Sequence, residues 1–265
     1  MPGEFAGKVV VVTGGSRGIG REIAVEFAKG GAQTVVVSSS PDNLAAATKI
    51  IAAAGGPAPL SIAADLRKLE GVQQVFKTVK EKFNRCDILV NSAGATKAGN
   101  FVDLPDEAWM DGYALKLFGC VRMCRTFWPM LKAANGFVVN IGGGAARSPG
   151  ADFSIGASVN AAMGNFSKAL SQQGKKDGVN VNVIHPGATD TERFGELLDM
   201  RSRASGKSID QLRAEATTKD GIRRIGTPAD IAAMTLFLCS DAAQYINGTV
   251  MVCDGGQSLG VVNKL

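Results

Sequence analysis

The chain has 265 residues, of which 45% are hydrophobic and 20% charged, and its formal net charge is +5. This composition is typical of a globular protein and excludes disordered, collagen-like and coiled-coil chains. Glycine is unusually frequent, at 33 residues, which predicts many tight turns or close backbone contacts. Because no basic run is interleaved with aromatic residues, we expect no nucleic-acid partner.

No apolar run approaches the roughly 18 residues of a membrane-spanning helix, and the chain does not begin with the charged-then-apolar pattern of a signal peptide. We therefore expect a cytoplasmic protein that does not bind a membrane. Five scattered cysteines fit reduced thiols in that compartment. With a single histidine, His185, and no clustered cysteines, we expect no metal site.

Short β-branched segments alternate along the chain with longer amphipathic segments. The expected strands are 9–12, 34–37, 60–63, 87–90, 137–141, 179–183 and 249–252. The expected helices are 18–29, 42–54, 70–83, 105–131, 153–172 and 228–239. Continuous apolar strands that alternate with helices predict a parallel sheet covered on both faces. The predicted fold class is α/β: a single doubly wound Rossmann-type domain over 1–265, with a seven-stranded parallel sheet.

The segment at about 188–222 differs from the rest because it contains no expected strand. Its two helical stretches, 192–203 and 208–217, are separated by Gly206. Such an excursion after a strand is either a plain surface feature or a lid over the ligand crevice, and we favour the lid.

A glycine-rich turn with the sequence TGGSRGIG follows the first strand at 13–20. Strand, glycine turn and helix is the order that a dinucleotide site requires. Gly14 permits the tight turn, Gly18 lets a pyrophosphate approach the backbone, and Gly20 lets the helix pack closely on the sheet. The free N–H groups at the start of the helix are suited to bind phosphate.

With this turn, the chain resembles the short-chain dehydrogenases/reductases over 8–256. The other segments that carry the resemblance are Asp65 after the third strand, NSAG at 91–94, Pro186-Gly187 with Thr191, and DGG at 254–256. The resemblance implies an oxidoreductase that transfers hydride between a nicotinamide cofactor and a small carbonyl or alcohol. It also implies a homo-oligomer, a tetramer or a dimer, which packs through helices near 110–131 and 153–170, where Gly156 and neighbouring alanines would permit close approach.

The cofactor choice depends on the charge at the end of the second strand. Enzymes that prefer NAD usually carry an acid there, whereas this strand ends in three serines, 38–40, and no acid precedes Asp42. Arg17 lies in the glycine turn, and its planar guanidinium suits a phosphate. We therefore favour NADP(H) over NAD(H). The predicted cofactor-binding residues are Gly14, Ser16, Arg17, Gly18, Ile19, Gly20, Ser38, Ser39, Asp65, Leu66, Asn91, Ala93, Gly94, Ile141, Pro186, Gly187, Thr189 and Thr191.

The catalytic Ser, Tyr and Lys that the resemblance implies are not found. The family's spacing places them at Gly143, Gly156 and Asn160, and neither tyrosine of the chain is followed by a lysine four residues later. A mid-helix glycine at 156 would reflect either close helix packing or an opened pocket.

Three other residues are candidate proton donors. They are Lys116, Ser154 and His185. Lys116 stands where the resemblance implies an asparagine, and burial in a crevice would lower its pKa toward neutrality. Each candidate also has an interpretation without a catalytic role. Lys116 would be a solvated lysine on a helix, Ser154 would belong to a loop that leads into a helix, and His185 would be a structural histidine.

Two functions remain open. The first is an NADP(H)-dependent oxidoreductase with a rewired active site, in which Lys116 or water supplies the proton. The second is a cofactor-binding protein without turnover, such as a sensor or a partner subunit. The absence of all three catalytic side chains favours the second, and the long lid favours the first. The resemblance assigns the oxidoreductase class, and the sequence does not reveal the substrate.

Overall fold

The computed structural model describes residues 3–258, apart from the side chains of residues 204, 219 and 220, so the two ends of the predicted 1–265 domain lie outside the described residues. Its centre is one seven-stranded parallel sheet with the strand order β3-β2-β1-β4-β5-β6-β7. The strands are β1 (Val9–Thr13), β2 (Gln33–Ser38), β3 (Leu60–Ala63), β4 (Ile88–Asn91), β5 (Phe137–Ile141), β6 (Asn180–Pro186) and β7 (Val250–Cys253). The predicted fold class, a single Rossmann-type domain with seven parallel strands, is confirmed.

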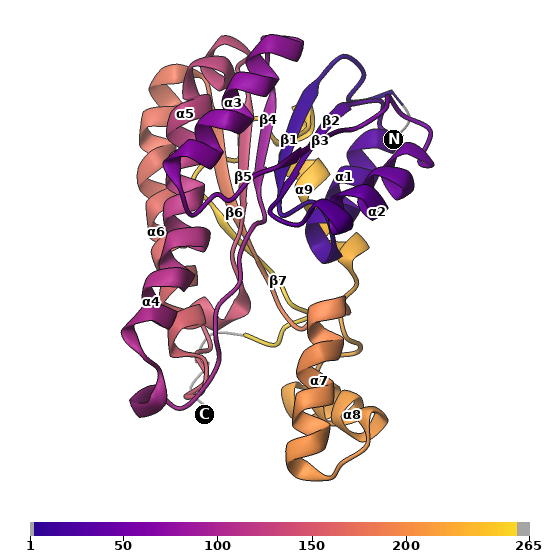
Figure 1. The fold of residues 1–265 in the computed structure, drawn as a ribbon, viewed down its shortest axis with the longest axis vertical. Helices are drawn as coiled ribbons and strands as arrows, with labels where there is room; N and C mark the ends of the chain where they lie inside the picture. Colours follow the sequence, from indigo (N-terminus) through magenta and orange to yellow (C-terminus); the bar gives the residue numbers. More distant parts are fainter. Residues whose placement is uncertain (1–2, 259–265) are drawn as a thin grey trace.

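Helices cover both faces of the sheet, as Figure 1 shows. One face carries α1 (Gly18–Lys29), α2 (Pro41–Ala52) and α9 (Pro228–Leu238). The other carries α3 (Leu69–Phe83), α4 (Asp106–Tyr113), α5 (Cys120–Ala133) and α6 (Ser154–Asp177). Successive strand residues point to opposite faces, so Val10 and Val12 belong to the first core and Val9 and Val11 to the second. Both cores are apolar, which explains why the strands read as uninterrupted hydrophobic runs.

The helix predicted over 105–131 is interrupted in the structure. A π-helical turn at Ala114–Gly119 joins α4 to α5 and includes Lys116. Apolar periodicity did not reveal this turn, because one extra residue per turn hardly changes a short pattern. Turns of this kind occur frequently at functional sites.

The sixth strand is longer than predicted. β6 ends at Pro186 rather than at residue 183, so His185 lies within the sheet, in register with Val252 of β7. The pairing continues past the proline because the N–H of Gly187 donates to the carbonyl of Cys253 at 3.1 Å. The strand expected at 179–183 left His185 outside the sheet, and this boundary is therefore wrong.

The segment 188–222 forms two helices, α7 (Glu192–Ser205) and α8 (Ile209–Asp220), which project from the body of the molecule (Figure 1). Thr191 begins α7 by accepting a hydrogen bond from the N–H of Phe194, and Gly206 ends it in the left-handed conformation, with a φ of 72°. Ser208 begins α8 with a capping box. None of the described helices is long and apolar enough to cross a membrane.

Candidate nucleotide-binding and active site

The turn between β1 and α1 has the backbone that its glycines predict. Gly14 and Gly18 adopt positive φ angles of 65° and 53°, a region that glycine enters without strain. A Cβ on Gly20 would overlap the carbonyl oxygen of Gly14, so α1 approaches the turn as closely as its backbone allows. The start of α1 therefore lies at the carboxyl end of β1 with its N–H groups available to an anion.

A carboxylate from the lid segment occupies this anion site. Glu192 Oε2 accepts a hydrogen bond of 3.1 Å from the N–H of Gly18, and Oε1 lies 2.8 Å from the guanidinium of Arg21. The half-exposed guanidinium of Arg17 lies 3.7 Å from Glu196, also on α7. Because a carboxylate is bound at the start of α1, the residues present fit a phosphate group.

Hydroxyl groups gather at the end of β2, beside the glycine turn. Ser16 donates to Ser38 Oγ at 2.9 Å, and the N–H of Ser40 donates to the same oxygen at 3.3 Å. Ser39 is exposed, and the nearest acid along the chain, Asp42, lies in the first turn of α2. The end of this strand therefore offers hydrogen-bond donors to a phosphate.

The loop after β4 is fixed against the glycine turn. Thr13 Oγ1 accepts from the N–H groups of Ser92 and Ala93 at 3.1 and 3.2 Å. A Cβ on Gly14 would lie 2.8 Å from the backbone of Ala93. Below this loop, Asn91 donates to Asn140 at 2.8 Å within a buried network. The sheet thus holds the ends of β1, β4 and β5 rigidly side by side.

The remaining predicted cofactor residues lie along the same edge of the sheet. Leu66 is buried, and Asp65 accepts from the backbone N–H of Arg67 at 3.0 Å. Thr189 donates to the carbonyl of Gly187 at 3.0 Å, at the base of the lid segment. The structure therefore brings the predicted residues to one edge of the sheet, where each strand ends.

Lys116 points into the crevice rather than into solvent. Its Nζ donates to the carbonyl of Gly142 at 3.0 Å, and its aliphatic stem lies across Gly94, where a Cβ would come within 2.8 Å of Lys116 Cδ. Burial, together with the positive charge of Arg193, lowers the pKa of Lys116 from its ordinary value of 10.5 to about 8. Lys116 is therefore able to donate a proton near neutral pH.

His185 is buried beneath the same loop and remains neutral. Its Nδ1 accepts a hydrogen bond of 3.1 Å from the N–H of Gly143, and a Cβ on Gly142 would overlap its ring. Burial lowers the pKa of His185 to about 4, and the charges of Lys116 and Arg147 act in the same direction. Because Nδ1 is an acceptor, the ring proton is on Nε2. These contacts fit a positioning role for His185 under the loop.

Two side chains fill the space beside the remaining glycines. A Cβ on Gly143 would lie 2.7 Å from Asn160 Nδ2, and a Cβ on Gly156 would overlap the ring of Phe153. Phe153 thus covers Gly156, so the glycine reflects close packing within the chain and not an opened pocket. Because this space is filled, Gly156 does not offer the close approach to a second subunit that the sequence suggested. Asn160 Oδ1 and Ser154 Oγ are buried without a partner among the described residues.

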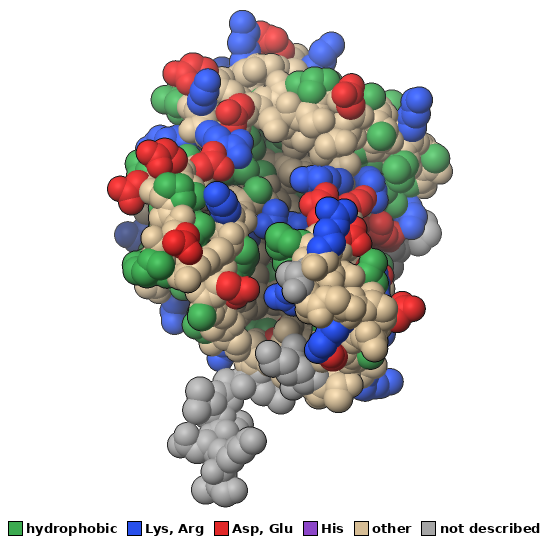
Figure 2. Space-filling view, turned by 60° about the horizontal axis from the view of Figure 1, so that its bottom comes forward, with side chains coloured by type: hydrophobic (Ala, Val, Ile, Leu, Met, Phe, Trp, Pro, Cys, Tyr) green, Lys and Arg blue, Asp and Glu red, His purple; other side chains and the backbone are tan. Residues whose placement is uncertain are grey.

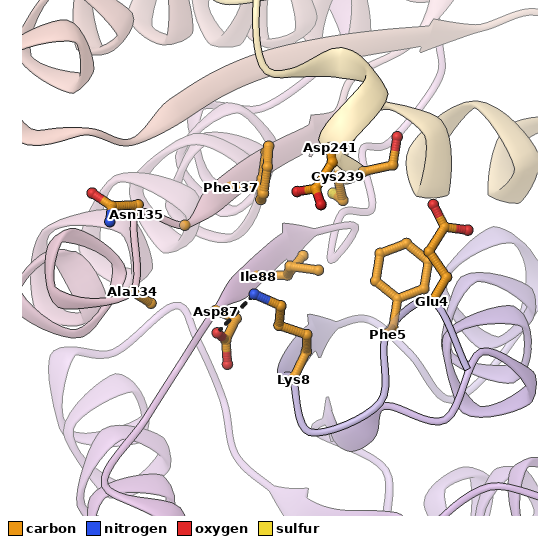
Figure 3. Close-up of a pocket in the computed structure, with 12 residues that line it drawn as sticks. Glu4, Phe5, Lys8, Asp87, Ile88, Ala134, Asn135, Phe137, Cys239 and Asp241 are labelled. Atoms are coloured by element: carbon orange, nitrogen blue, oxygen red, sulfur yellow. Dashed lines mark ion pairs between the residues drawn. The ribbon is translucent and has the colours of Figure 1, made fainter.

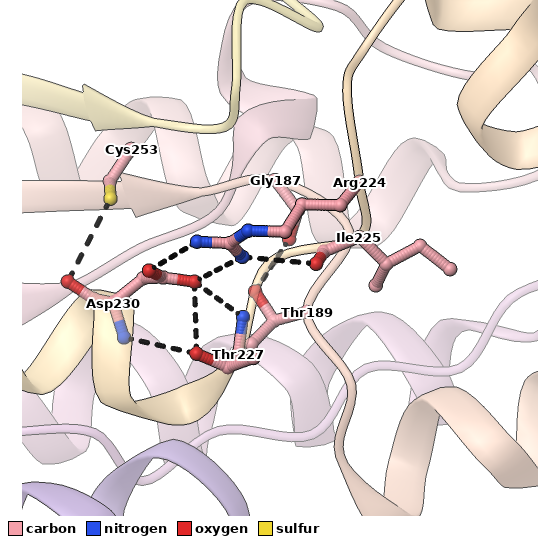
Figure 4. A network of polar contacts seen from close by, with 7 residues as sticks. All are labelled: Gly187, Thr189, Arg224, Ile225, Thr227, Asp230 and Cys253. Carbon is pink, nitrogen blue, oxygen red and sulfur yellow. Dashed lines mark hydrogen bonds and ion pairs between the residues drawn. The ribbon is translucent and has the colours of Figure 1, made fainter.

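The base of the lid segment is fixed where the chain returns to the sheet. Arg224 donates to both carboxylate oxygens of Asp230 at 2.7 and 2.8 Å, and Asp230 also accepts from Thr227 (Figure 4). The N–H groups of Asp190 and Gly226 donate across the two connecting segments at 2.8 and 2.9 Å. Both connections between the lid helices and the sheet are therefore anchored.

A separate hollow lies at the opposite, amino end of the strands (Figure 3). Its Asp87 accepts from the N–H of Val9 at 2.9 Å and pairs with Arg85 at 2.7 Å and Lys8 at 3.7 Å. The charge of Asp87 thus serves to hold β1 beside β4. None of the predicted site residues lines this hollow.

Comparison with known proteins identifies the family. A family model described as enoyl-(acyl carrier protein) reductase matches residues 14–258. The chain belongs to the short-chain dehydrogenase/reductase family. It is 31% identical to a 3-oxoacyl-[acyl-carrier-protein] reductase of Chlamydia trachomatis, over 97% of this chain and 100% of that one. Its identity to the corresponding Escherichia coli reductase is 30%, over 95% and 98% of the two chains.

Solved structures agree with this assignment to the short-chain dehydrogenase/reductase family. An L-sorbose reductase from Gluconobacter frateurii, complexed with NADPH and L-sorbose, is 31% identical over the whole of both chains, with a TM-score of 0.92. A family member of unknown function from Caenorhabditis elegans, solved with cofactor, has a TM-score of 0.88, at 30% identity and 98% coverage of each chain. Members of this family are oxidoreductases that bind a nicotinamide cofactor.

Three side chains in or beside the crevice make contacts that the sequence did not reveal. Phe153 was missed because nothing in the pattern shows which way its ring turns. Glu192 was missed because an acid in the first turn of a helix is ordinary. Arg193, a charged residue in the first turn of α7, donates to the carbonyl of Thr96 across the crevice at 2.9 Å, a contact that charge alone does not reveal. The run of three glycines at 142–144 was the one available signal that bulky groups crowd this loop.

Proposed function

We propose that this protein is an NADP(H)-dependent oxidoreductase that acts on a small carbonyl or alcohol, with Lys116 as its proton donor. The observation that carries the proposal is the placement of Lys116: an amine in the crevice, bound to a backbone carbonyl, with a pKa of about 8. An acid whose pKa lies near the working pH is effective in general acid–base catalysis.

The cofactor would lie along the carboxyl edge of the sheet. The start of α1 would hold its pyrophosphate, and Arg17, Ser38 and Ser39 would hold a 2′-phosphate. When bound, the nicotinamide supplies hydride to the carbonyl carbon of the substrate. We favour NADP(H) over NAD(H) because β2 ends in hydroxyl groups and Arg17 stands beside them.

The proton step involves residues of this chain alone. When hydride adds to a carbonyl carbon, negative charge develops on the oxygen, and the ammonium of Lys116 donates a proton to it, which leaves an alcohol and a neutral amine. His185 supports the step indirectly, because its Nδ1 holds the N–H of Gly143 and so fixes the loop whose carbonyl binds Lys116.

The test is the pH dependence of NADPH oxidation with a panel of aldehydes and ketones. Because the donor is the protonated amine, the rate of reduction falls as the pH rises through about 8. Lys116→Met lowers the rate by roughly 10²- to 10⁴-fold, the usual effect of losing a general acid, and removes this pH dependence. The control is Lys97→Met, which replaces an exposed lysine in the neighbouring loop. This variant retains the wild-type rate and its pH dependence. Unchanged turnover in Lys116→Met contradicts the assignment.

One observation favours a second function, cofactor binding without turnover. The ring of Phe153 fills the space beside Gly156, where the family resemblance implies a catalytic tyrosine. A sensor or partner subunit would retain the nucleotide site with such a blocked crevice. Tight NADPH binding with no turnover on any carbonyl of the panel supports this alternative over the first.

A further inference from the structure

The start of α1 is an anion site that already holds an anion from the same chain. Gly18 N–H is 3.1 Å from Glu192 Oε2, and Arg21 is 2.8 Å from Glu192 Oε1. A single N–H cannot donate fully to two anions, and two negative charges repel each other at hydrogen-bond distance. Glu192 and a phosphate therefore compete for the same donors.

The contact leaves no space for a phosphate between the lid and the turn. A Cβ on Gly18 would lie 3.3 Å from Thr191 Cγ2 and 3.7 Å from Glu192 Oε2. The first residues of the lid segment thus pack directly on the glycine turn. A phosphate that approached the N–H of Gly18 would have to displace the Glu192 side chain.

Two further contacts between α7 and the body are polar. Arg17 approaches Glu196 at 3.7 Å, and Arg193 donates to the carbonyl of Thr96 at 2.9 Å. Figure 2 shows this face, with a hollow between two lobes and acidic and basic side chains crowded beside it. Exposed ion pairs contribute little stability individually, so a competing anion is able to replace the carboxylates of Glu192 and Glu196 at Arg21 and Arg17. Backbone hydrogen bonds between Asp190, Gly226 and Ala188 join the two ends of the lid segment side by side.

We propose that Glu192 is an internal competitor of the cofactor pyrophosphate: it holds the lid segment, residues 188–222, on the glycine turn, and nucleotide binding releases it. This inference rests on the proposed function, because it takes the nicotinamide cofactor as the ligand of the turn. Displacement of Glu192 frees Arg21 to face the incoming phosphate. The lid therefore responds to the cofactor before any substrate is present.

The test compares Glu192→Ala and Glu192→Gln with Asp199→Asn, which removes the same charge from an exposed position on the same helix. Affinity for NADPH is measured by fluorescence, and hydrogen exchange of residues 192–205 is measured without cofactor. In the open state, Glu192 does not contact the glycine turn, and only this state binds NADPH. If about one molecule in ten is open without cofactor, Glu192→Ala opens the rest and tightens NADPH binding about tenfold. Glu192→Gln, which retains an acceptor oxygen, tightens it less, and Asp199→Asn leaves it within about twofold of the wild type.

Hydrogen exchange gives a second readout that does not depend on activity. We expect faster exchange at the start of α7 in Glu192→Ala without cofactor, and in the wild type when NADPH is added. Unchanged or weaker NADPH binding by Glu192→Ala, with unchanged exchange, would overturn the competition. A failure of wild type and variants alike to bind NADPH or NADH would overturn the proposed function and this inference with it.

Discussion

Arg17 is the charged residue on which the proposed preference for NADP(H) depends. Its guanidinium is half exposed, and the carboxylate of Glu196 is 3.7 Å away, too distant for a strong hydrogen bond. We expect tighter binding of NADPH than of NADH, and we expect Arg17→Ala to weaken NADPH binding by about 1.5–3 kcal/mol, the usual contribution of a hydrogen bond to a charged group. NADH binding should change little. Titration of both nucleotides by fluorescence measures the difference, and equal affinities in the wild type would contradict the preference.

The contact between Gly156 and Phe153 predicts how catalytic groups could be installed. The substitutions Gly143→Ser, Gly156→Tyr and Asn160→Lys introduce the side chains that the family resemblance implies, but the new tyrosine would overlap the Phe153 ring. We expect the triple variant to be destabilised and weakly active. Adding Phe153→Ala makes room for the tyrosine and raises the rate by roughly 10²- to 10⁴-fold.

Carbonyl reduction and thermal unfolding of the triple and quadruple variants, with Phe153→Ala alone as the control, measure both effects. If the triple variant is as stable and as active as the quadruple one, Phe153 does not limit the site.

At the level of elements, the sequence predicted the fold because its signals are local and repeated. Each strand is a β-branched run, each long helix has an apolar periodicity, and the glycine turn has a fixed spacing. The end of β6 was misjudged because its pairing with β7 depends on a distant segment. The contacts of Lys116, Phe153 and Glu192 could not be predicted, because each depends on a side-chain direction set by tertiary packing.

At the scale of the whole molecule, an exposed apolar surface supports assembly. Large hydrophobic side chains on and near α4 and α5 remain exposed: 63% of Phe101, 71% of Met110 and 48% of Phe118. Exposed large apolar side chains that gather in one region are typical of protein interfaces. We expect a tetramer of about 110 kDa, from chains of 27.5 kDa. Light scattering should show that Met110→Glu with Phe118→Glu lowers the mass, whereas Ile50→Glu on α2 does not; a monomeric wild type would contradict the expectation.

The glycines of the crevice also constrain how this protein could evolve. Gly142, Gly143 and Gly156 each face a larger side chain: His185 from β6, Asn160 from α6, and Phe153 from the start of α6. Replacing any one of these glycines meets occupied space, and shrinking only the neighbour leaves a cavity. Both single steps lower stability, so each pair must change together. Because each glycine and its neighbour depend on each other, a substitution at only one of the two positions is unfavourable. A different active site would therefore evolve only if both positions changed together, or if another substitution first compensated for the lost stability.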